Sequence, residues 1–152
     1  MEENNTMQFV FWQNMISIHQ SALIKALARE HGVLLAVQTD FEGERESSGW
    51  TVPDMGNARI LISPDARTVE ETLRAHPAAV HVFSGISTYP MVYAAFKQAV
   101  RRGLKTMVYA EPYRRQGWRG LLRSVKYRFP RLRYGKKIAA LLATGRLGVE
   151  CY

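Results

Sequence analysis

Short apolar runs alternate along the chain with longer stretches whose apolar residues recur at helical spacing. Residues 7–12 form the first run, and residues 17–30 carry an apolar stripe at positions 18, 22, 23, 26 and 27. A short apolar run is typical of a buried strand, whereas apolar residues three or four apart indicate one face of a helix. This pattern predicts strands at 7–12, 33–37, 59–63, 79–83, 105–110 and 138–143, and helices at 17–30, from 68 to before Pro77, 88–102, 121–127, 132–137 and from 145 onward.

The alternation of strands and helices predicts the fold class. Strand–helix–strand units favour right-handed crossovers between parallel strands. We therefore expect an α/β fold, a Rossmann-like three-layer sandwich with a mostly parallel sheet of about six strands. Residues 1–6 are polar and acidic and are expected to be a disordered leader, with residues 7–152 forming one domain.

Two segments match the capping-box pattern, in which a Ser or Thr is followed three residues later by Glu or Gln. Ser17 with Gln20 and Thr68 with Glu71 have this spacing. We therefore expect two helices to begin at these residues, with the paired side chains bonded to the backbone of the first turn.

Composition narrows the class of protein. The chain has 152 residues, 47% of them apolar, enough for one domain with a core. The single cysteine, Cys151, excludes a disulfide framework and a cysteine-based zinc site, and it favours a reducing, cytoplasmic compartment. No run approaches the roughly 18 apolar residues that span a membrane. The signatures of dehydrogenases, P-loop enzymes, zinc proteases and α/β-hydrolases are missing, which argues against those enzymes.

The net charge of +8 is concentrated in one segment. Residues 1–111 carry 10 Lys+Arg and 12 Asp+Glu, whereas residues 112–152 carry 11 Lys+Arg and one acid. Within residues 113–137, ten basic residues are interleaved with Trp and Tyr, a pattern that suits an anionic bilayer surface. The candidates for membrane contact are Arg119, Arg123, Lys126 and Arg128. A solvated basic face is the other interpretation, and nucleic acid is the least favoured partner because no RNA- or DNA-binding motif is present.

Polar side chains follow the first predicted strand at a place where no core needs them. Asn14, Ser17, His19 and Gln20 come directly after this strand and enter the first helix. Ligands of open parallel sheets bind outside the carboxyl ends of the strands. The sequence therefore predicts a ligand site there.

Several short strings resemble the N-terminal domain of bacterial GT-B glycosyltransferases, closest to family 4. The strings, in order along nearly the whole chain, are Phe11-Trp12-Gln13-Asn14 through His19-Gln20, Gly49-Trp50, Ala110-Glu111-Pro112 with Gly117-Trp118, and Ala143-Thr144-Gly145. The loop at residues 13–16 lacks the glycines that are common after the first strand of this family.

The resemblance implies an acceptor-binding domain that works with a second, C-terminal domain. That second domain would bind the nucleotide-sugar donor and carry two glutamates seven residues apart, and this chain has no room for it. The resemblance thus implies that the isolated chain is inactive, that the donor is a substrate and no cofactor or metal is needed, and that the acceptor is a sugar or lipid-linked glycan. Such acceptors favour a peripheral place on the inner face of the membrane.

Within that resemblance, His19 and Glu111 are the candidates for catalysis. His19 could bond an acceptor hydroxyl or help to remove its proton, or it is a surface histidine. Glu111 could bond sugar hydroxyls or hold a base, or it pairs with the arginines that follow. The substrate-binding candidates are Asn14, Gln20, Trp50, Ser84 and Gly85. Ser84-Gly85 and Glu111 follow the fourth and fifth predicted strands, so a parallel sheet would place them at the same edge as His19.

Three of these substrate-binding candidates have a second interpretation. Asn14 is a sugar contact or a turn residue, and Gln20 is a ligand contact or a capping partner. Trp50 stacks on a sugar ring or pins its loop to the core.

Overall fold

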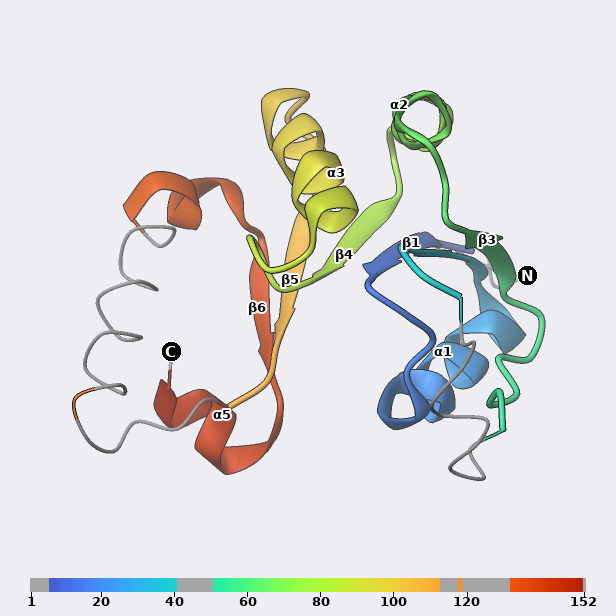
Figure 1. The fold of residues 1–152 in the computed structure, drawn as a ribbon, viewed down its shortest axis with the longest axis horizontal. Helices are drawn as coiled ribbons and strands as arrows, with labels where there is room; N and C mark the ends of the chain where they lie inside the picture. Colours follow the sequence, from blue (N-terminus) through green and yellow to red (C-terminus); the bar gives the residue numbers. More distant parts are fainter. Residues whose placement is uncertain (1–5, 41–50, 113–117, 119–131, 152) are drawn as a thin grey trace, which may run out of the picture.

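The computed structural model of the protein describes residues 6–40, 51–112, 118 and 132–151. The elements are β1 (Gln8–Gln13), α1 (Ile18–Glu30), β2 (Gly32–Val37), β3 (Arg59–Ile62), α2 (Ala66–Ala75), β4 (Val80–Ser84), α3 (Pro90–Arg101), β5 (Thr106–Ala110), the 3-10 helix η1 (Gly135–Lys137), β6 (Ala140–Ala143) and α5 (Gly145–Cys151). The strands form one six-stranded sheet in the order β3-β2-β1-β4-β5-β6 (Figure 1). Every neighbouring pair is parallel.

Helices cover both faces of this sheet. Because successive side chains of a strand point to opposite faces, β1 contributes to two separate cores. Val10 and Trp12 pack with residues of α2 and α3, whereas Phe11 packs with Ile24 and Ala28 of α1. Figure 1 shows α2 and α3 on one side of the sheet and α1 on the other. The fold is therefore the predicted Rossmann-like three-layer α/β sandwich, with a sheet that is parallel throughout.

The strand order creates a crevice at the middle of the sheet. The chain leaves β1 toward α1 on one face, and it leaves β4, the neighbour of β1, toward α3 on the opposite face. At such a switch point the two connections diverge and open a space outside the carboxyl ends of the strands. This space is where the fold favours a ligand.

Both predicted capping boxes are wrong. Helix α2 begins two residues earlier than expected, because Asp65 accepts a hydrogen bond of 2.7 Å from the backbone N–H of Thr68. Glu71 instead pairs with Arg67 at 2.7 Å. Ser17 precedes α1 but its side chain makes no capping bond, and the amide of Gln20 pairs with Gln13.

Some predictions lie outside the described residues. These are Trp50, the helix at 121–127, and the basic residues Arg119, Arg123, Lys126 and Arg128. The same is true of residues 1–5 of the predicted leader. Within the described ranges, no helix has the length and apolar character needed to cross a membrane.

Candidate ligand pocket at the carboxyl edge of the sheet

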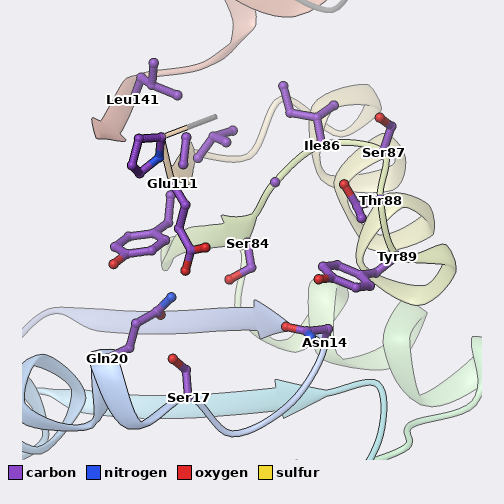
Figure 2. Close-up of a pocket in the computed structure, with 15 residues that line it drawn as sticks. Asn14, Ser17, Gln20, Ser84, Ile86, Ser87, Thr88, Tyr89, Glu111 and Leu141 are labelled. Atoms are coloured by element: carbon purple, nitrogen blue, oxygen red, sulfur yellow. The ribbon is translucent and has the colours of Figure 1, made fainter. Parts of the chain in front are cut away.

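A pocket of about 320 Å³ opens at the carboxyl edge of the sheet, beside the start of α1 (Figure 2). Its walls come from the β1–α1 connection, the β4–α3 connection, the end of β5 and one residue of β6. The lining residues are Asn14, Ser17, Gln20, Ser84, Gly85, Ile86, Ser87, Thr88, Tyr89, Val108, Tyr109, Ala110, Glu111, Pro112 and Leu141. The pocket thus lies at the switch point that the strand order creates.

The β1–α1 connection supplies one wall of the pocket. Its backbone is held in place at Asn14, whose carbonyl oxygen accepts bonds from the backbone N–H of Thr39 at 2.8 Å and from its hydroxyl at 2.9 Å. These two bonds tie the end of β1 to the end of β2. Asn14, Ser17 and Gln20 are therefore presented from a supported turn.

The β4–α3 connection supplies a wall rich in hydroxyl groups. Gly85 has a φ of 78°, a conformation that side chains disfavour, and this turns the chain away after Ser84. Ser87, Thr88 and Tyr89 follow before α3 begins. Figure 2 shows all of them lining one side of the pocket.

Near the start of α3, one backbone donor is already satisfied. The N–H of Met91 donates a bond of 2.9 Å to Oε1 of Gln38, and Pro90 has no N–H to offer. An ordinary helix start offers several free N–H groups to an anion, and the start of α3 offers fewer.

Three polar groups converge at the centre of the pocket. Figure 2 shows the carboxylate of Glu111, the amide nitrogen of Gln20 and the hydroxyl of Ser84 pointing toward one another. They come from the residue after β5, from α1 and from the end of β4, which are far apart in sequence. An acceptor, a donor and a hydroxyl in one place can satisfy a ligand hydroxyl from both sides.

A buried amide lies behind Gln20. Gln13, the last residue of β1, is only 1% exposed, and its Nε2 donates to Oε1 of Gln20, which is 4% exposed. Among the described residues, Oε1 of Gln13 is one of two buried side-chain atoms without a hydrogen-bond partner. Because buried polar atoms are almost always paired, this arrangement at the edge of a pocket calls for an explanation.

The described lining of the pocket is made mostly of neutral polar groups. This described lining offers hydroxyls, two amides, one carboxylate and the rings of Tyr89 and Tyr109, but no Lys, Arg or His. Phosphate sites usually rely on Arg, Lys or exposed helix N–H groups. In the described part of the chain, no group of three His, Cys, Asp or Glu side chains could hold a metal ion.

The structure brings most of the predicted site residues together. Asn14, Gln20, Ser84, Gly85 and Glu111 all line this pocket, although they come from three separate connections. Their shared position follows from the parallel sheet, whose strands all end at one edge.

His19 is the exception among the described candidates. It lies exposed on the first turn of α1 and is not among the pocket residues, whereas its neighbour Gln20 is buried and faces inward. Successive residues of a helix point in directions about 100° apart, so both could not face the pocket.

Two features of the pocket do not follow from the sequence pattern alone. The first is Gln13, a polar residue that closes an apolar run and becomes the buried partner of Gln20. The second is the pair of hydroxyls that Thr88 and Tyr89 contribute. Both residues lie in the connection that follows β4 at the same sheet edge. The rule that placed Ser84 there applies equally to the rest of its loop.

A different buried polar group, His81, lies in the middle of β4. Its Nδ1 accepts a bond of 3.2 Å from the indole N–H of Trp12, and its Nε2 lies 3.0 Å from the carbonyl oxygen of His76. Because a carbonyl only accepts, Nε2 carries the proton and the ring is neutral. Burial lowers the pKa of His81 from its ordinary value of 6.5. His81 is thus a satisfied residue of the core.

Comparison with known proteins gives no match to any protein-family model, curated protein or solved structure. The fold and the position of the pocket define a Rossmann-like α/β domain with a candidate ligand site at its switch point. Any function has to be argued from the chemistry of that pocket.

Proposed function

We propose that this chain is the acceptor-binding domain of a glycosyltransferase, which transfers a sugar from a nucleotide-sugar donor to a glycan or lipid-linked acceptor. The observation that carries the proposal is the lining of the pocket at the β1–β4 switch point. The described lining offers hydroxyl, amide and carboxylate groups and no Lys, Arg or His. Such a lining suits the hydroxyls of a sugar better than a phosphate. The sequence strings that resemble the glycosyltransferase domain support the same assignment.

In this proposal Glu111 is the group that acts on the acceptor. Its carboxylate accepts the proton of an acceptor hydroxyl, and the hydroxyl oxygen forms a bond to the anomeric carbon of the donor sugar. The bond between that carbon and the nucleotide phosphate breaks, and the nucleoside diphosphate leaves with the electron pair. A further domain would hold the donor, so the 152-residue chain alone is expected to bind acceptor but not to transfer sugar.

His19 has a weaker claim to the same role. It is exposed and outside the pocket, so it would need an acceptor that extends over the first turn of α1. His19→Ala and Glu111→Gln therefore distinguish two positions of the acceptor. If Glu111 is the base, Glu111→Gln lowers transfer in the complete enzyme by about 100- to 10,000-fold, while His19→Ala changes it little.

The binding half of the proposal can be tested on the chain itself. We would titrate ¹⁵N-labelled protein with methyl glycosides of glucose, galactose, mannose and N-acetylglucosamine, and separately with inorganic pyrophosphate. At least one glycoside should shift the resonances of Ser84, Gly85 and Thr88, and Glu111→Gln should weaken that binding. Glu71→Gln, the same change in an exposed ion pair on α2, is the control and should bind normally. Shifts in these residues with pyrophosphate and with no glycoside would contradict the proposal.

A second candidate function, a basic module that binds an anionic membrane without catalysis, rests on the charge distribution. The 11 Lys+Arg and single acid of residues 112–152 give one end of the sequence a net charge of +10. Each basic residue near an anionic bilayer contributes about 1 kcal/mol, and salt weakens the attraction. Replacing Arg119, Arg123, Lys126 and Arg128 with Gln should therefore release the protein from phosphatidylserine vesicles in a sedimentation assay. Equal pelleting of both proteins would remove this candidate.

A further inference from the structure

We infer that Gln13 is a positioning residue, which fixes the amide of Gln20 so that its nitrogen faces the pocket and forms a clamp for one ligand hydroxyl with Glu111. The inference rests on the proposed function for the identity of the ligand as a sugar. The orientation of the two amides rests on the structure alone.

The hydrogen bond between the two amides has a fixed direction. Gln13 Nε2 donates and Gln20 Oε1 accepts, so the carbonyl end of Gln20 is occupied inside the protein. Its other end, the NH₂ group, is directed toward Glu111 (Figure 2). An amide has a donor end and an acceptor end, so fixing one end decides what the other presents.

The opposite orientation of the two amides is disfavoured. If both amides turned over, Gln20 would aim its carbonyl oxygen at the carboxylate of Glu111, and two acceptors would face each other. The turn would also leave Gln13 with a buried NH₂ group without a partner in place of a buried carbonyl. Orphaned N–H groups are rarer in proteins than under-satisfied carbonyls. The unpartnered Oε1 of Gln13 is therefore the smaller of two penalties.

Burial separates Gln13 from any ligand in the pocket. Gln13 is 1% exposed and does not line the pocket, so a ligand does not reach it. Water cannot easily replace Gln13 as the partner of Gln20, because that side of the pair is closed by the core. Any effect of Gln13 on binding must then pass through Gln20.

The clamp selects a ligand group that both donates and accepts a hydrogen bond. A hydroxyl donates one hydrogen bond and accepts others, so it can donate to the Glu111 carboxylate while its oxygen accepts from Gln20 Nε2. An analogue without that hydroxyl makes neither of these two bonds, and a site built for hydrogen bonding rejects such an analogue strongly. The clamp therefore favours a sugar hydroxyl over a deoxy position.

The experiment is a double-variant cycle read by glycoside binding. With the tightest glycoside of the panel above as the probe, Gln13→Met and Gln20→Met should each weaken binding by about 2- to 12-fold, the effect of one neutral hydrogen bond. Because Gln13 acts through Gln20, the double variant should bind as weakly as Gln20→Met alone. Gln98→Met, the same change on α3 outside the pocket, is the control. Losses that multiply in the double variant would overturn the positioning role.

A second measurement decides the amide orientation without any ligand. In the free wild-type protein, the side-chain NH₂ resonances of Gln20 should report a fixed amide, and in Gln13→Met they should shift and exchange faster with solvent. Unchanged Gln20 resonances would overturn the inference even if binding is lost. If the wild-type protein binds no glycoside, the proposed function and the hydroxyl clamp both fall, whereas this spectrum still decides whether Gln13 positions Gln20. Should Gln13→Met not fold, Gln13→Leu is measured in the same way.

Discussion

Trp12 and Gln13 are neighbours in β1, and both are almost completely buried. They differ in how completely the hydrogen-bonding groups of their side chains are paired. The indole N–H of Trp12 bonds to His81, whose second nitrogen bonds to the carbonyl of His76, so this chain of groups is satisfied. The side chain of Gln13 donates a hydrogen bond to Gln20, and in the described part of the chain its Oε1 has no partner. The two side chains point to opposite faces of the sheet, and only that of Gln13 approaches the pocket through Gln20.

The difference separates a structural polar group from a functional one. A fully paired network inside a core stabilises one arrangement of the strands, and the stacked rings of Trp12, His81 and Phe83 add to it. An incompletely paired group beside a pocket lowers stability, and proteins keep such groups mainly where they serve a function. Mutations in the Trp12 network should therefore affect stability, and mutations in the Gln13 pair should affect binding.

The largest effect should come from removing Trp12. It is 0% exposed and is surrounded by core residues of both neighbouring strands and α3, so Trp12→Ala leaves a large cavity. We expect a loss of about 3–5 kcal/mol in the free energy of unfolding, measured with urea. Trp118→Ala is the matched control, because that side chain is 69% exposed and should contribute far less. Similar losses for both would contradict the central role of Trp12.

Replacing His81 should have the next largest effect. His81→Leu places an apolar side chain in the core and leaves the buried indole N–H of Trp12 without an acceptor. We expect a loss of about 1–3 kcal/mol in the free energy of unfolding. His19→Leu makes the same change at an exposed position, where about 0.5 kcal/mol or less is expected. If the two variants lose equally, the network is not a source of stability.

Acid should weaken the same network. Burial lowers the pKa of His81 below 6.5, so between that lowered pKa and pH 6.5 the unfolded chain binds a proton that the folded chain does not. Its contribution to stability is therefore complete above pH 6.5 and is lost as the pH falls, at up to about 1.4 kcal/mol per pH unit. Urea titrations from pH 7.5 downward measure this slope. In His81→Leu the slope should be smaller, and an equal slope would assign it to other groups.

Gln13 should matter least for stability. Gln13→Met keeps the length of the side chain, loses one hydrogen bond and removes an unpartnered carbonyl, and these effects partly cancel. We expect a change of less than about 1.5 kcal/mol in the free energy of unfolding, with a clear effect on glycoside binding. A loss of unfolding free energy as large as that of His81→Leu would show that Gln13 also has a mainly structural role.

The local pattern of the sequence determined the elements of this fold. Apolar runs such as residues 7–12 and helical stripes such as that of residues 17–30 depend on residues close in sequence, so they could be read directly. The alternation of these elements also predicted a parallel sheet. The rule that ligands bind at carboxyl strand ends then located Asn14, Gln20, Ser84, Gly85 and Glu111, which line one pocket.

Only the tertiary structure decided which partner each polar side chain takes. Gln20 and Glu71 have the spacing of capping boxes, but Gln20 pairs with Gln13 and Glu71 with Arg67, while Asp65 caps α2. A local pattern states which bonds are available, whereas packing decides which of several comparable bonds, each worth about 1 kcal/mol, is formed. The strand order is a similar case. It places β1 beside β4 through contacts between residues about 70 positions apart. The pocket exists because of that order, and no spacing along the chain encodes it.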